Sequence, residues 1–317
     1  MKYVEYLNNL IKEEVAKPEH AVLFGQNINA GSCLGGLTWG MKVMSGGRIF
    51  NSTNAENSLV GFGFGLMLNG VSGIFFMKQM DFLLLGIDQL VNTYNIIRSM
   101  KHQLKGGSFT IVATVVDSGY EGSQSSLNNF ADFCSIARIP GFAVTNKTDA
   151  DFIFSKHLVQ PGFRIIGVSQ RLGKTDIIEP GEPLKIFGDG TVFQYSEGND
   201  ATLVSFNFSF PQTHKLNAIL KEQGVNAAHF NVNSALVADW LPILESVKKT
   251  KKIVVVDDSK SANIPADSLL AEICGNVNLE NKAVIRRELA NEDWLRPVSD
   301  IFEIDEEKVI NMLKKQK

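Results

Sequence analysis

One carboxyl group is placed where it could take part in proton-transfer chemistry. Glu56 opens a segment whose next large side chains are apolar, namely Leu59, Val60, Phe62 and Phe64. Burial among apolar groups disfavours the charged form of a carboxyl, so such a group can stay protonated and donate a hydrogen bond. The alternative is that Glu56 is a carboxylate at the start of a helix, where it complements the positive end of the helix dipole.

Other patterns in the sequence give only weak support for a nucleotide-binding or metal-binding site. The GFGFG run at residues 61–65 is not the G-x-G-x-x-G fingerprint, and we expect it inside an apolar helix, where glycines permit close packing. The GDG run at residues 188–190 is expected to form a hairpin turn rather than the start of a magnesium–diphosphate motif. The five histidines show no metal-ligand spacing, so we predict no metal site on this chain.

The composition is that of an ordinary globular chain and excludes several function classes. The 317 residues suffice for two domains, and 44% hydrophobic with 21% charged residues argues against disorder. A net charge of −3 argues against a broad nucleic-acid surface. The apolar stretch at residues 59–76 is interrupted by glycines and polar residues, so we expect no membrane span. Cys33, Cys134 and Cys274 lie far apart, which predicts free thiols in a reducing cytoplasm.

Alternating helix and strand patterns predict an α/β fold. A stretch rich in glycine, proline and polar residues between 171 and 200 suggests a linker and a hairpin. We therefore predict two three-layer α/β domains with mostly parallel sheets, at residues 1–190 and 191–317. The expected helices are 4–15, 56–69, 82–100, 149–158, 214–223, 236–248, 266–274 and 306–315, and the expected strands are 21–24, 48–51, 109–116, 163–168, 203–206, 225–230 and 253–256.

Three separated segments resemble one known family, in the same order along the chain. RIFNSTNAENSLVGFGFG (residues 48–65) resembles a strand, loop and glutamate-led helix in the beta subunits of the decarboxylating component of 2-oxo acid dehydrogenases. Transketolases carry a related pattern. DFLLLGIDQLVNTYNIIR (residues 81–98) and SVKKTKKIVVVDD (residues 246–258) are similar to later segments of that family. The resemblance identifies the two predicted domains as a thiamine-diphosphate pyrimidine-binding domain and a transketolase C-terminal-like domain.

The resemblance implies a catalytic role for Glu56 and cofactor contacts for other residues. In this family, a glutamate in the place of Glu56 hydrogen-bonds the aminopyrimidine of thiamine diphosphate and stabilises the imino form that activates the cofactor. Phe82 takes the place of an aromatic residue that stacks on the pyrimidine. Gln26 stands where the family has an acidic residue. Ser123 and Gln124 lie in the loop where the dehydrogenases carry a histidine, and we expect both beside the cofactor.

The substrate side of the expected site departs from the dehydrogenases. Ser123 and Gln124 can hydrogen-bond, but they do not exchange protons near neutral pH as histidine does. A transferase that moves a two-carbon acyl or ketol unit from a 2-oxo acid, ketose or keto-sugar therefore fits at least as well as a 2-oxo acid dehydrogenase. Two alternatives remain open, a noncatalytic structural paralogue of such a subunit and a nicotinamide-dependent oxidoreductase.

The resemblance also implies a partner chain. In this family the magnesium–diphosphate end of the cofactor is bound by another domain or by a separate alpha-type chain, and no segment here has that motif. We therefore expect Mg²⁺ on an alpha-type partner, a heterotetramer of both chain types, and the cofactor at their interface. We expect neither nucleic acid nor membrane as a partner, and a cytoplasmic location.

Overall fold

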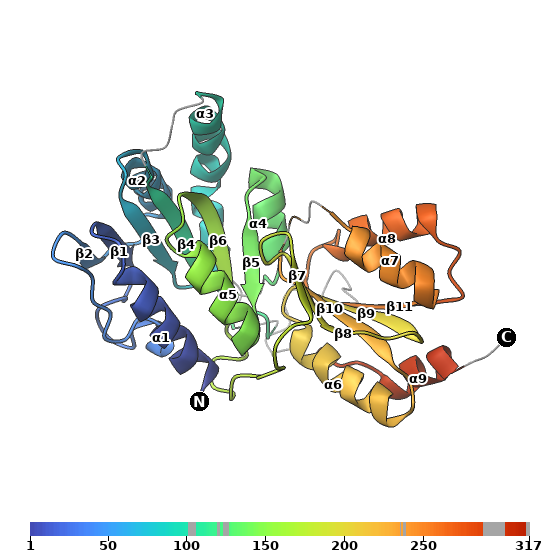
Figure 1. Cartoon of the computed structure of the whole chain (residues 1–317). Helices are drawn as coiled ribbons and strands as arrows, with labels where there is room; N and C mark the ends of the chain where they lie inside the picture. Colours follow the sequence, from blue (N-terminus) through green and yellow to red (C-terminus); the bar gives the residue numbers. More distant parts are fainter. Residues whose placement is uncertain are drawn as a thin grey trace.

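The computed structural model describes residues 1–100, 106–118, 121–122, 127–234, 236, 239–287 and 302–314. Over these ranges the predicted α/β class is confirmed, because the chain forms two six-stranded, mostly parallel sheets flanked by helices. The two sheets follow one another along the chain and lie beside each other (Figure 1). None of the helices in the described ranges is long and apolar enough to cross a membrane.

The first sheet is entirely parallel, with the strand order β2-β1-β3-β4-β6-β5. Its strands are β1 (Ala21–Gly25), β2 (Arg48–Asn51), β3 (Ser72–Met77), β4 (Ser108–Val115), β5 (Gly141–Val144) and β6 (Gly162–Ser169). One face is covered by α1 (Tyr3–Val15) and α5 (Lys147–His157). The other face is covered by α2 (Glu56–Leu68), the 3-10 segment η2 (Met80–Gly86), the π-helical turn η3 (Gln89–Thr93), α3 (Tyr94–Ser99) and α4 (Phe130–Ala137).

The second sheet has the order β12-β11-β9-β10-β8-β7 and is parallel except for β7 and β8. Its strands are β7 (Lys185–Phe187), β8 (Val192–Ser196), β9 (Ala201–Phe206), β10 (Ala227–Val232), β11 (Lys252–Asp257) and β12 (Asn281–Arg286). Its helices are α6 (Phe210–Glu222) and α9 (Glu306–Lys314) on one face, and α7 (Leu241–Thr250) and α8 (Ala266–Asn276) on the other.

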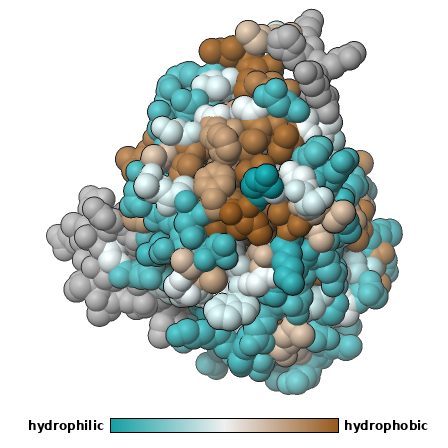
Figure 2. Space-filling model, turned by 90° about the vertical axis from the view of Figure 1, so that its left-hand side faces the viewer, coloured by the Kyte–Doolittle hydropathy of each residue, from teal (hydrophilic) through white to brown (hydrophobic). Residues whose placement is uncertain are grey.

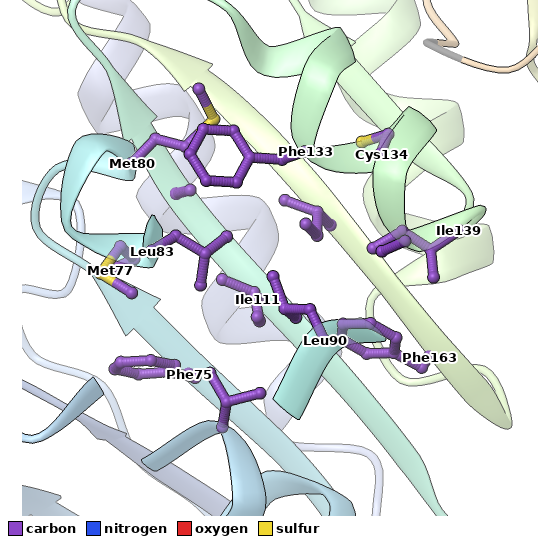
Figure 3. Close-up of a cluster of buried hydrophobic side chains, with 14 of the residues drawn as sticks. Phe75, Met77, Met80, Leu83, Leu90, Ile111, Phe133, Cys134, Ile139 and Phe163 are labelled. Carbon is purple, nitrogen blue, oxygen red and sulfur yellow. The ribbon is translucent and has the colours of Figure 1, made fainter. Parts of the chain in front are cut away.

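The core between the first sheet and α2 to α4 is aromatic and closely packed. Phe75 of β3, Ile111 of β4 and Phe163 of β6 are buried together on this face (Figure 3). Gly63 of α2 faces the ring of Phe109, and a Cβ on Gly63 would lie only 2.2 Å from Phe109 Cε2. The GFGFG run therefore lies inside a helix, and its predicted role in close packing is confirmed at Gly63.

The two sheets are joined along the edge of β5. The amide of Ala143 donates to the carbonyl of Asn233, 2.7 Å away, and Phe142 forms an antiparallel bridge with Ser234. Asn233 and Ser234 follow β10, so a segment of the second half closes this edge of the first sheet. The domain boundary at residue 190 stays a prediction, and in the structure it falls in the turn between the paired strands β7 and β8.

A buried carboxyl lies at the same junction. Asp149, in the first turn of α5, is fully buried and accepts hydrogen bonds from the Tyr195 hydroxyl and from Asn231 Nδ2, the latter at 2.6 Å. Both donors belong to strands of the second sheet. Burial raises the pKa of Asp149 to about 6, although the hydrogen bonds act in the opposite direction.

Several predicted elements differ from the structure. Strands β3, β5 and β12 and helix α4 were not predicted. For β3, the helix end near Gly70 was expected, but the apolar residues that follow it were not assigned to a strand. The helix predicted at 82–100 is broken into η2, η3 and α3. The helix predicted at 236–248 begins only at Leu241. The predicted hairpin turn at 188–190 is confirmed between β7 and β8, with a positive φ at each residue.

A methyl group on Gly63 should destabilise the chain relative to the same change on Gly65. Both substitutions to alanine gain the same helix propensity, but only Gly63→Ala forces the Phe109 ring or α2 to move. At Gly65 no heavy atom lies within 4 Å of the added Cβ. We expect the free energy of unfolding in urea to differ by about 1–3 kcal/mol between the variants. Equal stabilities would contradict this packing.

Asp149 should make the stability of the chain depend on pH. Its pKa in the folded chain is raised to about 6, so its contribution to stability is complete below its ordinary pKa and is lost as the pH rises through 6. Between about pH 4 and pH 7, the free energy of unfolding of the wild-type chain should fall by roughly 2–4 kcal/mol more than that of Asp149→Asn. Urea unfolding at several pH values measures this difference, and parallel pH profiles would refute the assignment.

Candidate active site

Three segments that are far apart in the sequence meet at the carboxyl edge of the first sheet. Strands β1, β2 and β3 are neighbours and parallel, so the residues that follow them lie at the same edge. Gln26 follows β1, Glu56 begins α2 shortly after β2, and Phe82 lies in η2 after β3. In open α/β sheets, ligands bind outside the carboxyl ends of the strands.

The segments after β1 and β2 are held together by backbone contacts. The amide of Ser52 donates to the carbonyl of Gly25 at 2.9 Å, and the amide of Asn29 donates to Asn51 Oδ1 at 2.9 Å. Gly25 has a φ of 150°, and a Cβ at this position would lie 2.3 Å from the carbonyl oxygen of Phe76. Only glycine fits there, so Gly25 lets the chain turn past β3 and bring residue 26 toward α2.

Glu56 lies at the first turn of α2 and is only 4% exposed. Gln26 Nε2 donates to Glu56 Oε1 at 3.3 Å, and Gln26 itself is half-buried. Within the described ranges, no cation pairs with Glu56, and its Oε2 atom has no hydrogen-bond partner. The carboxyl therefore combines the buried setting predicted from the sequence with one oxygen that is open to a ligand. Its place at a helix start is also compatible with the dipole alternative.

Phe82 lies on the segment that packs against the first turns of α2. A Cβ on Gly86, at the end of η2, would lie 2.9 Å from Val60 Cγ2 and 3.4 Å from the carbonyl oxygen of Glu56. Phe82 itself is half-buried against the aromatic core. At Gly86 the backbone of η2 therefore approaches α2 closely. This approach places Phe82 and Glu56 on adjacent segments.

Ser123 and Gln124 lie outside the described residues. Their described neighbours are bound to the segment around η2. The amide of Leu127 donates to Asp81 Oδ1 at 3.0 Å, and Gln79 Nε2 hydrogen-bonds the carboxylate of Glu121. Both ends of the loop that carries Ser123 and Gln124 are therefore attached beside Phe82. Their role at the site stays a prediction.

A second polar cluster, which sequence reasoning missed, lies where the carboxyl edges of the two sheets meet. Arg171 Nη2 lies 3.2 Å from Asp117 Oδ2 and 3.8 Å from Asp258 Oδ2. Asn128 Nδ2 donates to the carbonyl of Asp258 at 2.8 Å, and Arg287 Nη2 donates to the carbonyl of Asp117 at 3.0 Å. Burial raises the pKa of Asp258, and Asp117 acts in the same direction. Polar residues directly after buried strands, in TVVDSG and IVVVDD, were the signal that could have found this cluster.

The outer face of α2 is apolar although it is open to solvent. Phe62 of α2 is 41% exposed and Phe50 of β2 is 38% exposed, and their ring centroids lie 6.0 Å apart. Both rings also contact Phe24 beneath them. Figure 2 shows hydrophobic residues gathered on this side of the molecule. A helix that is apolar on all sides is normally buried, so this face is suited to a protein contact.

The described residues hold no group of histidine, cysteine or acidic side chains able to bind a metal ion. A groove of about 440 Å³ lies between α5 and residues 179–186, and none of the predicted site residues lines it. The candidate site is therefore an edge of the first sheet beside an apolar face, and not this groove.

The chain is similar to beta subunits of pyruvate dehydrogenase over most of its length, although no protein-family model matches it. It is 24% identical over 280 residues to the pyruvate dehydrogenase E1 component subunit beta of Acholeplasma laidlawii, which covers 85% of this chain and 83% of the relative. The corresponding protein of Staphylococcus epidermidis is 23% identical over 319 residues, covering 96% of this chain and 97% of the relative. The mitochondrial protein of Dictyostelium discoideum is 23% identical, with coverages of 88% and 86%.

One solved structure shares the fold over nearly the whole chain. It is described as a split-gene transketolase in an inactive beta4 tetramer. The TM-score is 0.64 at 17% sequence identity, and the match covers 98% of this chain and 96% of the other. The predicted combination of two α/β units in this order is therefore found in a known protein.

Proposed function

We propose, from the chain's place in the transketolase-like beta-subunit family, that it is the pyrimidine-binding subunit of a two-chain thiamine-diphosphate-dependent enzyme. Such an enzyme transfers a two-carbon acyl or ketol unit from a 2-oxo acid, ketose or keto-sugar. The observation that carries the proposal is Glu56, a buried carboxyl that opens an apolar helix at the carboxyl edge of a parallel sheet.

The residues at this edge fit the pyrimidine end of the cofactor. Glu56 Oε2 is without a hydrogen-bond partner in the described part of the chain, which is the condition for contact with a ring nitrogen. When bound, thiamine diphosphate supplies the nucleophilic carbon on which the two-carbon unit is carried. Glu56 holds a proton against the pyrimidine nitrogen, and its burial keeps water from competing for that hydrogen bond.

Other residues of the chain bind and orient the cofactor in this proposal. Phe82 supplies an aromatic face for the pyrimidine ring, and Gln26 holds the carboxyl of Glu56. Ser123 and Gln124 hydrogen-bond on the substrate side. The glycines at 61–65 lie within α2 and not in a turn between a strand and a helix, so they lend no support to a nicotinamide cofactor.

The proposal includes an alpha-type partner that binds Mg²⁺ and the diphosphate. The exposed apolar face of α2 and β2, which holds Phe62 and Phe50, borders the site and supplies a surface for subunit contact. We infer a heterotetramer with the cofactor at the interface. We keep the cytoplasmic location as part of the proposal, and the three free cysteines are compatible with it.

Glu56→Gln should abolish most of the turnover of the assembled enzyme. A glutamine cannot hold the proton that the pyrimidine requires, and loss of one proton-transfer group typically costs about 10²–10⁴-fold in rate. Glu14→Gln is a matched control, because Glu14 is also buried, at 5% exposure, but pairs with Lys17 far from the site. Steady-state kinetics with the alpha-type partner measure both variants. Full activity of Glu56→Gln would instead support a noncatalytic paralogue.

Phe62→Asp should weaken subunit assembly without unfolding the chain. The ring is exposed in the single chain, but a charge buried in an apolar contact typically costs about 2 kcal/mol or more, which is roughly a 30-fold loss of affinity. Leu184→Asp is the control, because Leu184 is 53% exposed in the linker before β7. Sedimentation of the chain with its partner measures assembly. Unchanged association of Phe62→Asp would exclude this face as a contact.

A further inference from the structure

The carboxyl of Glu56 is held by an amide, and that choice of partner has chemical consequences. Gln26 Nε2, 3.3 Å from Glu56 Oε1, is the one hydrogen-bond donor to this carboxyl among the residues that the structure describes. A primary amide does not ionise in the ordinary pH range, and its NH₂ group only donates. The proton of a neutral Glu56 is thereby directed to the other oxygen, Oε2.

The position of Gln26 is built into the fold. Its neighbour Gly25 is fixed by the hydrogen bond from Ser52 and by the close approach of Phe76, and Asn27 adopts a left-handed conformation with φ 54°. These constraints leave Gln26 half-buried and facing α2. The contact with Glu56 therefore follows from the backbone path, and a longer or shorter side chain at position 26 would not reproduce it.

An acidic residue at position 26 would give Glu56 a different titration. Two carboxyls at hydrogen-bond distance share a proton, and their titrations become those of a coupled pair with one step moved toward higher pH. With glutamine at position 26, no second carboxyl among the described residues hydrogen-bonds Glu56.

The other charged groups near Glu56 bond to other partners and do not orient its carboxyl. On the elements packed against α2 these are Asp81 in η2, Asp88 beside η3, Arg98 in α3 and Arg48 in β2. Asp81 accepts a hydrogen bond from Leu127, and Asp88 accepts one from Asn92. Arg48 donates to the Gly47 carbonyl, and Arg98 to the Arg138 carbonyl. No described residue other than Gln26 forms a hydrogen bond or ion pair with the Glu56 side chain.

We propose that Gln26 is a positioning residue that orients the Glu56 carboxyl, directs its proton to Oε2, and keeps a second carboxyl from sharing that proton. This inference rests on the proposed function, because it assigns Glu56 Oε2 to the cofactor. The amide makes the activating group insensitive to the protonation of a neighbour. The enzyme therefore keeps one active form over a wider pH range than a carboxylate pair would allow.

The first test needs neither cofactor nor partner. In the full chain labelled with ¹³C at the glutamate carboxyls, the Glu56 signal, assigned by its loss in Glu56→Gln, should titrate in a single step. In Gln26→Glu, the Glu56 signal should titrate in two steps, one of them at higher pH than in wild type. Gln89→Glu is the matched control, since Gln89 lies beside Gly61 on the neighbouring turn and bonds Thr93. It should leave the Glu56 titration in one step.

The second test uses the assembled enzyme. Gln26→Glu is isosteric and donates a hydrogen bond when protonated, so it should keep at least a third of the wild-type kcat on the acidic side. Its kcat should fall roughly tenfold or more as the pH rises above the first titration step of the carboxyl pair at positions 26 and 56. Gln26→Leu should lose kcat roughly tenfold at every pH, with little change in the KM for the donor substrate. A purely structural role for Gln26 would instead give Gln26→Glu and wild type parallel pH profiles.

The outcomes separate this inference from the proposed function. A single-step Glu56 titration in Gln26→Glu, in a chain whose circular dichroism and melting match the wild type, would overturn the role of Gln26 and leave the function intact. If Gln26→Glu does not fold, Gln26→Leu takes its place, and a kcat equal to that of the wild type at every pH in that variant would overturn the inference. Full activity of Glu56→Gln would overturn the proposed function itself.

Discussion

The parallel alignment of β1, β2 and β3 is the constraint on which the candidate site depends. Because neighbouring strands run in the same direction, the segments that follow them emerge at one edge, however far apart they are in the sequence. Gln26, Glu56 and Phe82 come together for this reason. The small residues at Gly25 and Gly86 then bring the backbones close enough for side chains to interact.

The Glu56 carboxyl is buried with few hydrogen bonds to replace those it would make with water. An unpaired charge in such a place is costly, and the described residues provide one amide and no cation. The Asp258 carboxyl, which is fully buried directly after β11 of the second sheet, lies in contrast between Arg171, Asn207 and Asn128. The chain thus buries one carboxyl with a single described hydrogen-bond partner and another with several. A buried carboxyl with an unengaged oxygen is what the proposed cofactor contact at Glu56 requires.

The order of helices and strands could be predicted from the sequence more accurately than the points at which individual elements begin, end or break. The start of α2 at Glu56 and the strand at 48–51 were predicted correctly, since a short β-branched strand and an apolar helix have distinct periods. The prediction of one helix at 82–100 was wrong, since its apolar spacing does not show where the segment breaks into η2, η3 and α3. The four residues of β5 carry too little pattern, and their edge is completed by Asn233, which is distant in the sequence. The polar cluster at Asp117 and Asp258 was missed because its residues, too, are distant in the sequence and meet only in the fold.

Among the described residues, the segment after β10 pairs with β5, and β2 is left as the unpaired edge strand of the first sheet. That strand is only four residues long and carries Phe50, and the exposed Phe62 stands beside it on α2. An unpaired edge strand exposes backbone amide and carbonyl groups that another chain can pair with. Because this edge and the two exposed rings lie side by side, a single contact with a second chain would cover both the open hydrogen-bonding groups and the apolar surface.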